Sequence, residues 1–165
     1  QSRFYRSIEA TTRYKYDYPL DIWSVGCVLF ELYTKIPLFP SVDEFDHFKM
    51  ITQIFGMPHK NMIESFKSYF KLIKKEQVRT SKYSMYDKIL NYIDNYNYYN
   101  VLNSSQEIIK SKIIKHVSNV ETSSYEFDVL CYIISNMLIL DPYQRIDIDQ
   151  AICINQLTID EYLNF

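Results

Sequence analysis

Side chains that commonly act as nucleophiles, bases or metal ligands are few and scattered in this chain of 165 residues. The three cysteines stand far apart in apolar runs, without the Cys-x-x-Cys spacing of a zinc or redox site. His116 has no second histidine, cysteine or paired carboxylate at metal-ligand spacing around it. We therefore predict no metal site, a surface histidine, and reduced core thiols in a nuclear or cytoplasmic protein.

Loops that cradle phosphate need closely spaced glycines, and the chain has only Gly26 and Gly56. No GxGxxG or GxxxxGK[ST] motif is present. A formal net charge of −2 and a pI of about 5.9 give no case for direct binding of nucleic acid. We expect no membrane contact either, because the most apolar stretch is shorter than the roughly 20 residues of a membrane span.

Residues 21–34 form the stretch around which the other elements must pack. Nearly every residue after Asp21 is apolar, on every face that a helix could present, and a helix that is apolar all round is a buried one. At 1.5 Å per residue this helix would span about 21 Å, the width of a small domain. Asp21 suits its N-terminus as a structural cap, because a carboxylate accepts the unpaired N–H groups there. We expect a central buried helix that begins at Asp21.

Apolar residues recur at helical spacing over 45–55, 61–75 and 127–140, and a last helix is expected near 148–154. No stretch alternates with period two, so the predicted fold class is mainly α. Residues 76–124 are rich in Asn, Tyr, Ser and Lys. We predict mostly loop there, with one helix over 106–116, and interpret the segment as an insert, which costs little free energy in a loop.

Three segments, in this order, resemble the C-terminal lobe of a eukaryotic protein kinase. Residues 5–9, YRSIE, resemble the end of the activation segment; residues 21–27, DIWSVGC, resemble the start of the F helix; and residues 140–146, LDPYQRI, resemble the segment before the last helices. Their order and spacing make the set specific. The resemblance implies that residues 1–165 form a partial protein kinase domain, the C-terminal (large) lobe only.

The finer resemblance is to the CMGC group of kinases. Residues 1–7, QSRFYRS, are similar to the dual-specificity tyrosine-regulated (DYRK) branch. Residues 16–27 and 57–63 are similar to the related pre-mRNA-processing kinases, which carry an insert where residues 76–124 fall. The resemblance implies a Ser/Thr kinase whose complete form uses ATP and Mg²⁺, phosphorylates protein substrates and has a role in mRNA splicing.

The resemblance also assigns roles to residues near the beginning of the chain. Ser2, Arg3 and Tyr5 would belong to the P+1 loop that binds the substrate. Arg3 and Arg6 would hold a phosphotyrosine of the activation loop, a role that suits arginine because its planar guanidinium pairs with phosphate through two hydrogen bonds. Arg3 is also expected to satisfy a backbone carbonyl and so favour proline after the phosphorylated residue. The alternative is that all of these are exposed loop residues without a ligand.

By the same resemblance, Glu9 and Arg145 would form a buried ion pair that ties the activation segment to the lobe. Physical chemistry agrees, because a buried Arg or Glu without a partner is very costly. The alternative is that both residues face solvent. Asp21 would, besides capping its helix, accept hydrogen bonds from a catalytic loop that this chain does not contain.

The chain also departs from the kinase pattern. Ile8 stands where a proline is usual, Lys35 stands where a glycine is usual, and the HRD, DFG, glycine-rich and strand-lysine motifs are absent. Phosphoryl transfer depends on those motifs. We therefore expect no catalytic residue and no cofactor in this chain alone, and an N-terminal lobe of the same kinase as its partner. The alternative function is a non-catalytic helical interaction module or a pseudokinase remnant.

Overall fold

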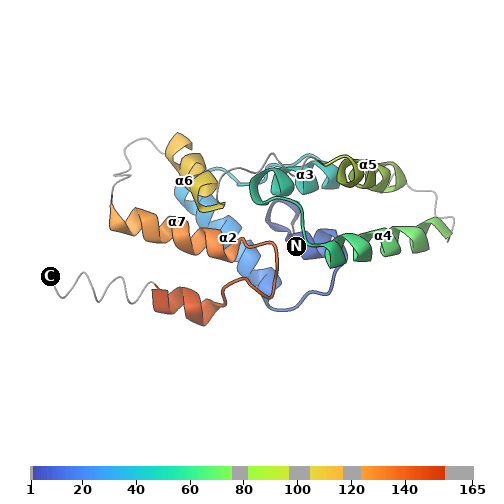
Figure 1. The fold of residues 1–165 in the computed structure, drawn as a ribbon. Helices are drawn as coiled ribbons and strands as arrows, with labels where there is room; N and C mark the ends of the chain where they lie inside the picture. Colours follow the sequence, from blue (N-terminus) through green and yellow to red (C-terminus); the bar gives the residue numbers. More distant parts are fainter. Residues whose placement is uncertain (1, 76–81, 97–104, 117–123, 155–165) are drawn as a thin grey trace.

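The computed structural model describes residues 2–75, 82–96, 105–116 and 124–154, and its regular elements there are helices (Figure 1). They are the 3-10 helix η1 (Arg3–Tyr5) and the α-helices α1 (Ile8–Thr11), α2 (Pro19–Thr34), α3 (Glu44–Phe55), α4 (Lys60–Lys75), α5 (Lys82–Asp94), α6 (Ser105–His116) and α7 (Tyr125–Met137), followed by a helical stretch over 148–154. The mainly α class is confirmed. No helix within the described ranges is long and apolar enough to cross a membrane.

Helix α2 is central, because it contacts η1, α6 and α7. Its buried residues follow one helical face and are Trp23, Gly26, Cys27, Phe30 and Thr34. At Gly26 an added Cβ would lie 3.0 Å from the Cβ of Met137 and 3.0 Å from the side chain of Leu138. Glycine therefore lets α2 and the end of α7 pack with almost no space between them.

The opposite face of α2 is open to solvent in this structure. Val25, Val28 and Leu32 have relative exposures of 38%, 42% and 61%. The expectation of a helix buried on every face is therefore wrong for the described chain, in which α2 covers the core from one side. Apolar residues on that face have no cover from the described helices, which is unusual for a folded domain.

The start of α2 also differs from the prediction. The helix begins at Pro19, after Tyr18, and Pro19 occupies the first turn, where its missing N–H and fixed φ are favourable. Asp21 is the third residue of the helix; it is exposed and does not cap the helix. Its carboxylate still lies near the positive end of the helix dipole. Asp21 is thus a favourable charge in the first turn and not the predicted cap.

The other half of the lobe is built by α3, α4 and α5, which lie beside one another in Figure 1. Phe66 and Phe70 of α4 both contact the ring of Tyr86 in α5 edge to face, at centroid distances of 5.5 and 5.9 Å. Aromatic pairs of this geometry are favourable beyond the area that they bury. A continuous hydrophobic core joins this half to the side chains around Trp23 and Phe39.

Residues 76–124 are more helical than their composition predicts. The expectation of mostly loop is wrong over α5, where Tyr86, Ile89 and Ile93 are buried at the spacing of one helical face. Asn, Asp and Lys between them hide this period. The predicted helix over 106–116 is confirmed as α6, with Ile109 and Ile113 buried. The rest of the segment lies outside the described residues, and its interpretation as an insert stays a prediction.

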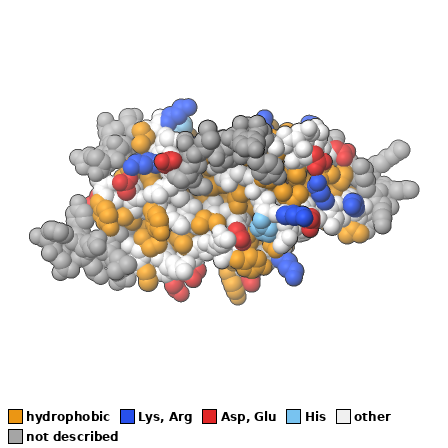
Figure 2. All heavy atoms as spheres, viewed as in Figure 1, with side chains coloured by type: hydrophobic (Ala, Val, Ile, Leu, Met, Phe, Trp, Pro, Cys, Tyr) orange, Lys and Arg blue, Asp and Glu red, His pale blue; other side chains and the backbone are white. Residues whose placement is uncertain are grey.

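The surface carries charges of both signs together with several exposed apolar side chains. Figure 2 shows hydrophobic side chains over the region that α7 occupies in Figure 1. Tyr125 and Tyr132 of α7 are both exposed. Exposed single apolar residues of this kind are normal on a folded protein, and they require no partner.

Candidate functional site

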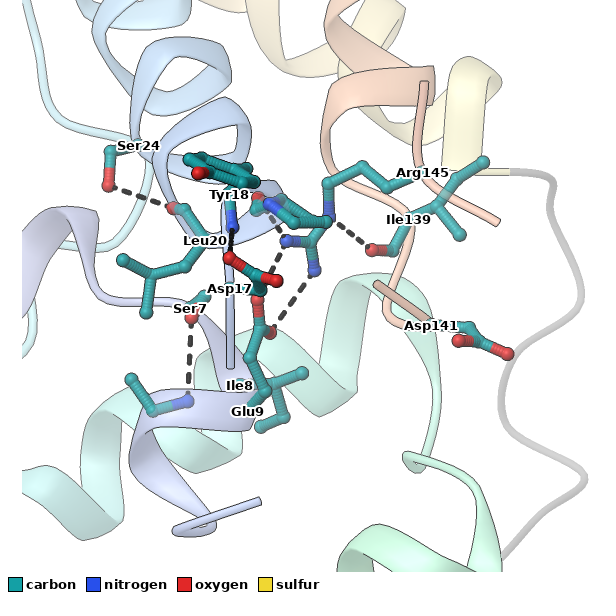
Figure 3. Close-up of polar contacts among 12 residues, drawn as sticks. Ser7, Ile8, Glu9, Asp17, Tyr18, Leu20, Ser24, Ile139, Asp141 and Arg145 are labelled. Atoms are coloured by element: carbon teal, nitrogen blue, oxygen red, sulfur yellow. Dashed lines mark hydrogen bonds and ion pairs between the residues drawn. The ribbon is translucent and has the colours of Figure 1, made fainter. Parts of the chain in front are cut away.

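A buried ion pair joins the first and last segments of the lobe (Figure 3). Nη1 of Arg145 lies 2.7 Å from Oε1 of Glu9, and Nη2 lies 3.1 Å from Oε2. Both side chains have a relative exposure of 0%. Two parallel N–H···O bonds to one carboxylate are the strongest form of this interaction, and they fix direction as well as distance. The predicted pair is therefore present, and the solvent-facing alternative is wrong.

Arg145 uses its remaining donors to hold two further segments. Its Nε donates to the carbonyl of Ile139 at 3.0 Å, and Nη1 also donates to the carbonyl of Pro19 at 2.5 Å. The guanidinium lies over the ring of Trp23, 5.2 Å from its centroid, which adds a cation–π interaction. One side chain therefore joins α1, the start of α2 and the loop that follows α7.

The segment over residues 2–6 is fixed to α2 through Tyr5. The hydroxyl of Tyr5 donates to Oε2 of Glu31 at 2.7 Å, and its carbonyl accepts from the hydroxyl of Ser24 at 3.0 Å. The hydrogen bond to the Glu31 carboxylate raises the pKa of Tyr5. Ser2 precedes η1 with an exposed side chain, and its carbonyl accepts from the N–H of Tyr5 at 3.2 Å.

The two arginines predicted to hold phosphate both turn toward the beginning of α3. Nη1 of Arg6 lies 2.8 Å from Oε1 of Glu44. Nη1 of Arg3 donates to the carbonyl of Val42 at 2.5 Å and to that of Ser41 at 3.4 Å. The structure therefore brings Arg3 and Arg6 to one short stretch of chain, where acceptors of the protein itself occupy them.

His47 is a residue of this site that sequence reasoning missed. Its side chain is fully buried in α3, and Nε2 donates to the carbonyl of Arg6 at 2.8 Å. Since Nε2 carries the proton in the neutral ring, Nδ1 accepts from the hydroxyl of Ser41 at 3.3 Å. A single histidine among apolar residues carries no signal in the sequence, because a core position and a binding position look alike.

The imidazole of His47 is held in its neutral form. Burial lowers its pKa to about 4, and the nearby cations Arg6 and Arg3 contribute to this, while the hydrogen bond to the Arg6 carbonyl and the charge of Glu44 act in the opposite direction. A neutral ring keeps one donor and one acceptor, so it can bridge residues 2–6 and the loop before α3.

The cysteines and His116 make no reactive centre. Burial raises the pKa of the Cys27 thiol, and it raises that of Cys131 to about 11. These two are core thiols as predicted, whereas Cys153 is exposed and corrects that expectation. His116 lies at the surface at the end of α6, as expected. The described residues contain no group of three His, Cys, Asp or Glu that could hold a metal ion.

The helical lobe, with its internal ion pair and with residues 2–6 bonded to α2 and to the start of α3, agrees with the large lobe of a protein kinase. The family model "Protein kinase domain" matches residues 1–155. The chain belongs to the protein kinase family.

The curated relatives narrow this assignment. Similar proteins include "Probable serine/threonine-protein kinase dyrk2" of Dictyostelium discoideum, 48% identical over 65 residues, which are 39% of this chain and 7% of that protein. "DYRK-family kinase pom1" of Schizosaccharomyces pombe is 45% identical over 64 residues (39% and 6%), and human "Dual specificity tyrosine-phosphorylation-regulated kinase 3" is 46% identical over 67 residues (41% and 11%). Each match spans a small part of the relative's length. The matches agree with a CMGC kinase of the DYRK branch, and a link to splicing stays a prediction.

Replacing Arg145 by alanine should destabilise the lobe strongly. The Glu9 carboxylate would stay buried without a partner, which costs about 3–5 kcal/mol and should lower the melting temperature by roughly 10 °C. Thermal unfolding followed by circular dichroism measures this. Lys71→Ala, an exposed residue of α4, is the control, and an equal shift in both variants would contradict the role of the pair. The double variant Glu9→Gln with Arg145→Met should recover part of the loss, since no charge remains buried.

The buried His47 should make the protein less stable in mild acid. Its pKa is lower when folded than the 6.5 of the unfolded chain, so between pH 6.5 and 4 the unfolded state binds more protons. The contribution of neutral His47 to the free energy of unfolding is therefore fully present above pH 6.5 and is lost as the pH falls toward 4. Between pH 7 and pH 5 the loss should be about 2 kcal/mol, measured by urea unfolding at both pH values. The variant His47→Gln cannot titrate, so its free energy of unfolding should fall by about 2 kcal/mol less over the same pH range than that of the unchanged protein. Equal losses in the two proteins would show that another group is responsible.

Proposed function

We propose that this chain is the substrate-binding lobe of a CMGC protein kinase of the DYRK branch, and that the complete protein transfers phosphate from ATP to Ser or Thr in protein substrates. The observation that carries the proposal is the fixed position of residues 2–6. They hydrogen-bond to α2 and to the start of α3, and the Glu9–Arg145 pair fixes the helix that follows them. A substrate peptide that lies on a preorganised segment loses less entropy on reaching the reactive position.

ATP and Mg²⁺ are used by protein kinases in general, but residues of this chain do not fit a site for them. The sequence has no glycine-rich loop and no HRD or DFG motif, and the described residues offer no metal-ligand cluster. The nucleotide and the metal would be bound by other segments of the complete protein. Residues 2–6 of this chain would orient the substrate peptide relative to the bound nucleotide.

The exposed face of α2 supports this division of work. Val25, Val28 and Leu32 form an apolar stripe on the same helix as Ser24, whose hydroxyl binds the Tyr5 carbonyl. Removing such a stripe from water stabilises a protein by about 25 cal/mol for each Å² of apolar surface. The remaining segments of the kinase would cover this stripe. A non-catalytic interaction module would also expose an apolar face, but the kinase relatives do not favour that alternative.

Arg3 and Arg6 would serve the activation segment once it is present. Both guanidinium groups lie within one short region, at Val42 and Glu44. A phosphotyrosine carries nearly two negative charges and three acceptor oxygens, so it would compete well against one carboxylate and one carbonyl. In the phosphorylated kinase Arg6 would then exchange the Glu44 carboxylate for phosphate oxygens. Arg3 would keep its Nη1 bonds to carbonyls and reach the phosphate with its other nitrogens.

The chain 1–165 alone should have no kinase activity, whereas the complete protein should phosphorylate a basic protein substrate. The difference is expected because positioning and charge stabilisation by the ATP-binding motifs provide most of the catalysis. Incorporation of labelled phosphate measures both. Activity of residues 1–165 above a buffer control would contradict the division of work, and an inactive complete protein in its phosphorylated form would favour the pseudokinase alternative.

The complete kinase should prefer Ser-Pro and Thr-Pro sites. An arginine at the position of Arg3 that satisfies a backbone carbonyl leaves no acceptor for a substrate N–H, and proline has no N–H to offer. Arg3 does donate to carbonyls here. Any other residue after the acceptor would bury an unpaired N–H donor at a cost of about 1–3 kcal/mol, or roughly 5- to 150-fold in kcat/KM.

A peptide library with proline or alanine after the acceptor residue tests this preference. Arg3→Ala is expected to reduce the preference, and Lys71→Ala is the control. Equal use of both peptides by the unchanged kinase would contradict it.

A further inference from the structure

A pocket of about 410 Å³ lies between the segment before α2 and the loop after α7. Its lining residues are Lys15, Tyr16, Asp17, Pro19, Pro142 and Tyr143. The volume is within the range of about 300–1,000 Å³ that is typical of ligand sites. None of residues 2–6 lines the pocket, so it is separate from the contacts that hold residues 2–6.

The two walls are fixed to each other by Arg145 (Figure 3). Its guanidinium donates to the carbonyl of Pro19 in one wall, and its own backbone follows Tyr143 in the other. Asp141 closes the second wall as a turn, because its carboxylate accepts from the N–H of Tyr143 at 3.0 Å and its carbonyl accepts from that of Arg145 at 3.1 Å. A pocket whose walls are held in this way is formed before any ligand arrives, which reduces the entropy cost of binding.

The rim of the pocket is aromatic and exposed. Tyr16 and Tyr143 have relative exposures of 64% and 75%, and neither ring packs against another aromatic ring of the described chain. Pro19 and Pro142 line the same pocket. Tyrosines and prolines that line an open groove are the surface that binds proline-rich segments in the polyproline II conformation, which needs no ordering before it docks.

In the first wall, the Asp17 carboxylate is a fixed acceptor for a cationic group of a ligand. Oδ1 of Asp17 accepts from the N–H of Tyr18 at 2.9 Å, which fixes the carboxylate. Its Oδ2 has no partner among the described residues and can accept from a cation. Lys15, the lining cation, is exposed on a long flexible side chain and can turn toward solvent, whereas the carboxylate of Asp17 is held in place.

We propose that this pocket is a docking site for a proline-rich segment of a partner protein that carries an arginine or lysine next to its prolines. Proline rings of the partner lie between Tyr16 and Tyr143, and the basic residue pairs with Asp17. The site works without phosphoryl transfer, so it does not depend on the catalytic proposal.

Fluorescence anisotropy of the full-length protein with the labelled peptide APPAPPR tests the proposal. Saturable binding is expected, and Tyr143→Ala should weaken it about tenfold, whereas Tyr143→Phe should keep it because the ring face makes the contact. Asp17→Asn retains an oxygen for the N–H of Tyr18 and should weaken binding at low salt only. Tyr132→Ala, an exposed tyrosine of α7, is the matched control and should bind normally.

Peptide controls decide between this and other occupants. AAAAAAR should bind at least about tenfold more weakly than APPAPPR, and APPAPPE should also bind more weakly. Equal binding of the alanine peptide would overturn the polyproline assignment. Tighter binding of APPAPPE would show that Lys15 sets the charge preference, and no saturation by APPAPPR or an equal loss in Tyr132→Ala would overturn the site. Unchanged thermal unfolding of each variant confirms that the fold is intact.

Discussion

The structure depends on the requirement that neither Glu9 nor Arg145 can be buried alone. Moving a single carboxylate or guanidinium from water to a protein interior costs several kcal/mol even after relaxation. The cost is offset here by two hydrogen bonds between the groups, by the carbonyls of Ile139 and Pro19 and by the ring of Trp23. Three segments that are distant in the sequence therefore meet at one point.

The ion pair also sets the geometry of residues 2–6, because α1, which carries Glu9, follows them directly. With Glu9 fixed, residues 2–6 can reach α2 through Tyr5 and α3 through Arg6. His47 completes this connection by binding the Arg6 carbonyl with one nitrogen and Ser41 with the other. Residues 2–6 are thus held by a neutral side chain, that of His47, which adds no charge to a region that already contains two arginines.

Sequence reasoning succeeded where a residue type imposes a requirement and failed where only packing decides. The resemblance to kinases paired Glu9 with Arg145, and the pairing agrees with the rule that buried charges need partners. The start of α2 was misplaced because Asp21 is a good cap in isolation, yet Pro19 fixes the first turn. Helix α5 was missed because its apolar period lies among polar residues, and it forms by packing on α3 and α4. The role of His47 depends on two neighbours from other segments, and so no local pattern could reveal it.

The sequence separation of the ion pair has a consequence for how the chain is made. Glu9 and Arg145 are 136 residues apart, so at a synthesis rate of about 5–20 residues per second Arg145 is added roughly 7–27 s after Glu9. Single helices form in microseconds, and α2, α3 and α4 therefore have ample time to appear while Glu9 remains hydrated and without its partner. Glu9 can thus reach its final place only after Arg145 has been added, and a nascent chain that ends before Arg145 exposes the apolar surface that chaperones and proteases recognise.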